Sequence, residues 1–340
     1  MATTLRGFKP AAVSMTWCNS ARPASLCNTL GKLLFMRVPL PAAMMTMSNF
    51  NARSFKLCCI IAATACAFFL QACSAVKLGY NQAPDIAYWW LDSYIDFNGQ
   101  QTPKVRDELT RLFAWHRSTE LPKYTALLQK TQAQMPRDVS AEQVCAVYGE
   151  ARALYNNVTE KIQPAVVDLS SSLGVEQIDH LARQYAKKNE EYQRDYLKGS
   201  AGDRAAKRLK QAVERSETVY GKLEEPQIAA IKKAIASSSF DAAVWLKERM
   251  RRQQDALQIM RKIVAERPDS PAVQSLLRGY LSRSLVSPDP VYRAYAEKMT
   301  QESCMSFSDV HATTSAAQRV KAAQTLQGYA ADFSALAAQK

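Results

Sequence analysis

Apolar residues recur at helical spacing along almost the whole chain after residue 82, and this period constrains the fold most. In the clearest stretch, Ser140 and Gln143 match a capping box, and apolar residues then follow every three or four positions to Ile162. Strand signals are weak throughout, and eleven glycines are few for a sandwich or barrel. The sequence therefore predicts an all-α fold, an antiparallel multi-helix bundle, and leaves open whether the bundle is elongated.

Prolines, glycines and capping residues set the expected helix boundaries. Pro122 predicts a break or kink near Thr119, and Pro164 predicts a kink before Leu169. The expected helices span residues 84–97, 102–119, 120–134, 140–174, 175–197, 203–223, 225–239, 241–267, 270–281, 290–303 and 315–339. Residues 304–312 are expected to form a loop.

A segment of a different kind precedes these helices. The run from Leu57 to Cys73 is apolar and uncharged, and it follows Arg53 and Lys56. A basic start, a short apolar run and a small residue before a processing point are typical of a secretory signal peptide. The alternative, a buried core helix, is disfavoured because the run has no one-sided pattern. It is also short for a hydrocarbon core of about 30 Å.

Because Cys73 directly follows Ala72, the segment resembles a bacterial lipoprotein signal, although Gln71 departs from the small or apolar residue usual at its position. The resemblance implies cleavage before Cys73 and lipid on its thiol, with plain secretion as the alternative. By its resemblance to sorting signals of Gram-negative lipoproteins, Ser74 in place of Asp implies sorting to the outer membrane. The expected organisation is a non-structural or untranslated leader (1–46), a signal peptide (47–72), a tether (73–81) and a helical periplasmic domain (82–340).

The positive charge is concentrated in the leader. Of the 44 Lys and Arg residues, seven precede Cys73, where there is no Asp or Glu, so the remaining chain carries 37 basic and 31 acidic residues. This mild excess does not predict nucleic-acid binding. An ordinary solvated surface is the favoured interpretation, and contact with anionic lipid is the alternative.

Five of the eight cysteines precede Cys73, which leaves Cys145 and Cys304. Two cysteines in an oxidising compartment favour one disulfide between them. The alternative is two separate buried thiols, because free cysteine is among the most buried residue types.

No motif of a nucleotide, metal or nucleophile site is present, so no catalytic residue, metal ligand or cofactor is predicted. The best candidate is an N-terminal polar cluster on two consecutive helices: Asp92, Asp96, Trp115, His116, Arg117 and Glu120. It could tune a proton-transfer group, or it could fix the packing of the two helices, which is the favoured interpretation. A basic helix face, Lys247, Arg249, Arg251 and Arg252, is expected to be solvated, with anionic lipid as the alternative.

Several motifs together resemble an uncharacterised family of Gram-negative lipoproteins defined only by a domain of unknown function. They are YNQA at 80–83, WLDSYID at 90–96, WHR at 115–117 with ELPKY at 120–124, and TSAAQR at 314–319. The resemblance covers Cys73 to the end of the chain and implies location and helical character, but no activity.

These observations favour a non-enzymatic module that is anchored to the outer membrane by lipid, faces the periplasm, and binds an envelope protein or polymer. One alternative is an enzyme that acts on peptidoglycan or lipid through Asp92, Asp96, His116 and Glu120. The other is a carrier of a hydrophobic ligand, which needs an apolar cavity of several hundred Å³.

Overall fold

The computed structural model describes residues 75–339, and within this range every regular element is a helix. The all-α prediction is confirmed. The helices are α3 (Ala75–Asn81), α4 (Ala83–Ile95), α5 (Gln101–Trp115), the π-helix η1 (His116–Glu120), α6 (Leu121–Gln134), α7 (Ala141–Ser171), α8 (Val175–Tyr196), α9 (Ala201–Tyr220), α10 (Glu225–Ser237), α11 (Ala242–Glu266), α12 (Ser270–Leu285), α13 (Pro290–Ala312) and α14 (Ala316–Ala337).

Serine caps fix several helix starts. Ser140 Oγ accepts a hydrogen bond from the backbone N–H of Gln143, and the Gln143 side chain accepts one from the backbone N–H of Ser140. Ser315 and Gln318 make the same reciprocal pair at the start of α14. These bonds satisfy backbone donors that have no partner within the helix, so each helix begins at a defined residue.

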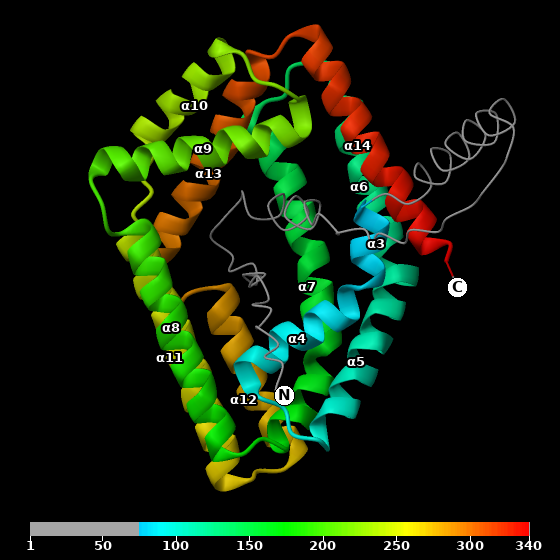
Figure 1. The fold of residues 1–340 in the computed structure, drawn as a ribbon, viewed down its shortest axis with the longest axis vertical. Helices are drawn as coiled ribbons and strands as arrows, with labels where there is room; N and C mark the ends of the chain where they lie inside the picture. The colour runs from blue at the N-terminus through cyan, green and yellow to red at the C-terminus, as the bar shows by residue number, and fades with distance from the viewer. Residues whose placement is uncertain (1–74, 340) are drawn as a thin grey trace, which may run out of the picture.

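The long helix α7 runs between the two ends of the molecule (Figure 1). Its first turns pack against α6 and α13, and its last turns pack against α11 and α12. Pro164 lies inside α7, and the helix continues past it to Ser171. The helix therefore connects two packed regions at its opposite ends.

The core at one end of α7 is built by α6, α9, α10, α13 and α14. Its buried residues are Met135, Val139, Tyr220, Leu223, Ile231, Val310 and Ala322. At the other end, α7, α11 and α12 bury Val167, Ile259, Ile263, Val273 and Leu277. The α8–α11 pair runs along one side of the molecule and joins the two ends, as Figure 1 shows. The bundle is therefore elongated.

Two sequence predictions are wrong. Residues 304–312 are not a loop, because α13 continues to Ala312 and buries Cys304, Val310 and His311. Serine and aspartate lower the local helix propensity there, and burial overrides it. Most of the predicted tether also forms a helix, since α3 begins at Ala75 and buries Val76.

Candidate functional site

The predicted N-terminal polar cluster is divided between the two ends of α5. Helices α4 and α5 are antiparallel neighbours, so Asp92 and Asp96 lie beside the start of α5, whereas His116 and Glu120 follow its end. A helix of 15 residues separates them by about 22 Å along its axis. The prediction that these side chains form one cluster is therefore wrong, since they cannot act on one substrate atom.

The two aspartates close the C-terminal end of α4. The backbone N–H of Phe97 donates to Asp92 Oδ1 at 2.9 Å. Asp96 is the C-cap in the left-handed region, with φ 60°, and its carbonyl accepts a hydrogen bond from Gln177 Nε2 at 2.9 Å. Both residues therefore have a structural role in the turn that leads to α5.

The other half of the cluster holds α3 in place. The hydroxyl oxygen of Tyr80 in α3 lies 2.8 Å from His116 Nδ1, and Arg117 Nη2 donates to Asn81 Oδ1 at 2.9 Å. Lys77 lies 3.8 Å from Asp332 of α14. Burial raises the pKa of Tyr80 to about 12, although Arg117 opposes the shift. The Tyr80 hydroxyl is therefore protonated at neutral pH, and its hydrogen bond with the imidazole joins α3 to η1.

Glu120 and Trp115 connect η1 to α7. Glu120 is 1% exposed and accepts hydrogen bonds from Lys123 Nζ at 2.7 Å and Asn157 Nδ2 at 3.3 Å. Lys161 Nζ lies 5.5 Å from the centre of the Trp115 ring. The predicted break near Thr119 takes the form of the π-helical segment, since Pro122 cannot donate a backbone hydrogen bond.

The docking of α3 is expected to weaken at acidic pH. Burial lowers the pKa of His116 below its ordinary 6.5, only partly opposed by Glu120. The docked state therefore binds fewer protons than the released state, so docking is fully favoured above about pH 6.5 and is lost as the pH falls. Hydrogen-exchange protection factors of the α3 amides should fall severalfold between pH 7.5 and 5.5. His116→Gln should remove most of this dependence, and the control His180→Gln should keep it. Equal pH dependence in all three proteins would contradict the assignment.

Of the basic α11 residues expected to form a solvated face, Lys247 is exposed, whereas Arg251 and Arg252 form an ion network with Glu248. Glu248, 5% exposed, accepts hydrogen bonds from Arg251 Nε and Arg252 Nε, each at 2.8 Å. Ser287 Oγ donates to the same carboxylate at 3.1 Å. Arg249 lies over the Trp245 ring. A continuous basic surface for lipid is therefore not present on these turns, because the charges are used in packing α11 against the segment before α13.

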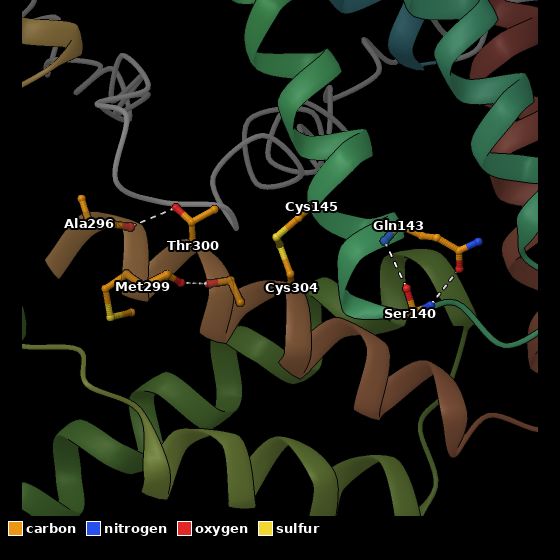
Figure 2. The surroundings of a disulfide bond; sticks show 8 residues. Ser140, Gln143, Cys145, Ala296, Met299, Thr300 and Cys304 are labelled. Atoms are coloured by element: carbon orange, nitrogen blue, oxygen red, sulfur yellow. Dashed lines mark hydrogen bonds between the residues drawn. A yellow bond between two sulfur atoms is a disulfide. The ribbon is translucent and has the colours of Figure 1, made fainter. Parts of the chain in front are cut away.

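Cys145 and Cys304, the two cysteines within residues 75–339, form a disulfide. Cys145 lies in the first turns of α7 and Cys304 in α13, and their sulfur atoms are 2.02 Å apart (Figure 2). The bond lies next to the capping box of Ser140 and Gln143, so it fixes the start of α7 to the middle of α13.

A basic cleft that the sequence analysis missed lies where α8 ends, between α9, α10 and the start of α11. Its volume is about 520 Å³. The cations Arg204, Lys207, Arg208 and Lys232 line it, together with Asp195, Tyr196, Leu209, Ile235, Phe240 and five alanines. An adjoining hollow of about 500 Å³ shares Tyr196, Arg204, Phe240 and Ala242. The sequence signal that could have indicated this cleft is the alternation of Ala201 and Ala205 with Arg204 and Arg208 on one face of α9.

Other site types are not found in the described part of the chain. Within residues 75–339, no three His, Cys, Asp or Glu side chains are grouped so that they could hold a metal ion. Among the helices described, none is both long and apolar enough to span a membrane. Cys73, the predicted lipidation site, lies outside the described residues.

Comparison with known protein families identifies a family to which the chain is similar. The model of a family of unknown function, DUF6279, matches residues 93–292. Neither the curated proteins nor the solved structures include a match.

Proposed function

The chain belongs to a family of unknown function, DUF6279, and from this starting point we propose that it is a lipid-anchored, non-enzymatic helical module of the bacterial envelope. Cys73 would carry the lipid, and the helical body would face the periplasm from the outer membrane. The body would bind an envelope protein, polymer or lipid.

The proposal depends mainly on the position of α3. This helix begins at Ala75, two residues after Cys73, and is fastened to the body through the Tyr80–His116 and Asn81–Arg117 contacts. A lipid on Cys73 would therefore be joined to a fixed helix and not to a flexible tether. Such an anchor would set the orientation of the body relative to the membrane surface.

The disulfide supports an exported location. Disulfides persist in oxidising compartments, such as the bacterial periplasm, and are rare in the cytosol. The Cys145–Cys304 bond therefore agrees with export directed by a signal peptide before Cys73. It also favours a long-lived structural or binding role, because it cross-links helices α7 and α13.

Lipidation is expected to depend on Cys73. Radiolabelled palmitate fed to producing cells should enter the protein, and Cys73→Ser should abolish the label because the acylated thiol is lost. The unmodified protein should be found with the outer membrane, while the variant should be lost from that fraction, since several acyl chains are needed for durable attachment. Cys145→Ser is the control and should keep both label and location. Absence of label in the unmodified protein would refute the proposed anchor.

A further inference from the structure

We infer that the basic cleft between the end of α8 and helices α9, α10 and α11 binds an amphiphile with a phosphate head and an aliphatic chain. The inference deepens the proposed function, because it names the class of ligand that the helical body would bind. It rests on the shape, charge and packing of the cleft.

The alanines make room for a chain. On α9, Ala201 and Ala205 are four residues apart and share one face, and Ala236 of α10 lines the same cleft. Phe240, Ile235 and Leu209 supply the larger apolar walls. The volume of about 520 Å³ is within the range of small-ligand sites.

The cations that line the cleft outnumber the carboxylates that line it, and three of the four cations have no ion-pair partner within residues 75–339. Four cations and one carboxylate, Asp195, line the cleft. Of these four cations, Lys232 forms an ion pair with Glu225 at 3.4 Å, whereas Arg204, Lys207 and Arg208 form no ion pair with a carboxylate within residues 75–339. Arg204 Nη1 donates to the Gly199 carbonyl at 2.7 Å, and Lys207 Nζ donates to the Asp195 carbonyl at 2.8 Å. Both cations are therefore held at the rim by neutral acceptors, which leaves their charge available to an anion.

Arg208 is the residue best placed to bind the head. Its guanidinium lies 5.0 Å from the centre of the Phe240 ring, at the boundary between the charged and apolar walls. Burial lowers its pKa, with Tyr295 and Glu302 opposing the shift. A planar guanidinium can donate two parallel hydrogen bonds to a phosphate, and aromatic stacking holds it in orientation. A phosphate head at Arg208 would place its chain along Phe240 and the alanines.

Calorimetric titration of the full-length chain carrying Cys73→Ser tests this inference with dodecyl phosphate below its micelle concentration. The substitution makes the result independent of lipidation, so failure of the anchor and failure of the cleft give different outcomes. Saturable one-to-one binding is expected. Dodecyltrimethylammonium and inorganic phosphate should bind at least tenfold more weakly. Equal binding of the cationic detergent, or of inorganic phosphate alone, would overturn the inference.

Two further variants distinguish the contribution of the cationic side chain from that of the free volume of the cleft. Arg208→Gln should weaken the binding of dodecyl phosphate at least tenfold, whereas Arg278→Gln, an exposed control on α12, should leave the affinity unchanged. Ala205→Trp keeps every charge but fills the cleft, and Ala205 is exposed at its rim, so the fold should tolerate the change. It should also weaken binding at least tenfold. Unchanged affinity in both Arg208→Gln and Ala205→Trp, with far-ultraviolet circular dichroism as the check on folding, would exclude the cleft as the site.

Discussion

Replacing both Cys145 and Cys304 with alanine is expected to lower the free energy of unfolding by about 2–5 kcal/mol. The two residues are 159 positions apart, so their bond closes a very long loop in the unfolded chain and restricts its conformations. Cys304 is also buried, and its loss removes packing at the contact of α13 with α7. The midpoint of urea unfolding should fall accordingly.

Reductant provides the control for this prediction. The unmodified protein should lose most of the same stability when it is reduced, whereas the double variant should not respond to reductant. Ser303→Ala, next to the bond, should change the free energy of unfolding by less than about 0.5 kcal/mol. A double variant as stable as the oxidised protein would show that packing alone holds α7 to α13.

The helices could be predicted because their signals are local. The capping boxes at Ser140 and Ser315 lie within four residues of sequence, and both helices begin where those pairs indicate. The loop prediction for residues 304–312 is wrong because the contacts that stabilise the helix there are not local in sequence. There, His311 is fixed by Tyr220 OH at 2.9 Å and by the Arg137 carbonyl at 2.8 Å, contacts with residues 91 and 174 positions away. No window around residue 311 contains this information.

The candidate site was harder to predict for the same reason. Asp92 and His116 are close in sequence, but the antiparallel pairing of α4 and α5 places them at opposite ends of α5. The cleft, in contrast, takes residues from four segments that only the tertiary fold brings together. The Tyr80–His116 contact spans 36 residues and could not be read from periodicity. Single-sequence patterns therefore predicted the elements here, but not which faces meet.

The pairs that join distant segments also set where the structure should be most sensitive to change. Surface ion pairs within one helix, such as Lys262 with Glu266 at 3.9 Å, are exposed and should contribute little. The Glu248 network is different, because it is buried and links α11 to Ser287 in the segment before α13. The strongest single-residue effect is therefore expected at Glu248.

Glu248→Gln is expected to lower the free energy of unfolding by about 3–5 kcal/mol, because it removes the carboxylate that faces the buried guanidinium of Arg252. The measurement is urea unfolding at pH 7, with Glu266→Gln as the control, expected to cost less than about 1 kcal/mol. Replacing Glu248 and Arg252 together by leucine should cost less than Glu248→Gln alone, since no charge of the pair is then left buried.

The pH dependence gives a second readout of the same group. Burial alone would raise the pKa of Glu248, but the hydrogen bonds and charges of Arg251 and Arg252 outweigh it and lower the pKa below its ordinary 4.5. The folded state therefore binds fewer protons, so this contribution to stability is complete above about pH 4.5 and is lost as the pH falls below it. Stability of the unmodified protein should decline more steeply below that pH than stability of Glu248→Gln. Parallel curves for the two proteins would mean that the carboxylate is not ionised in the folded chain, and that the network is held by neutral hydrogen bonds.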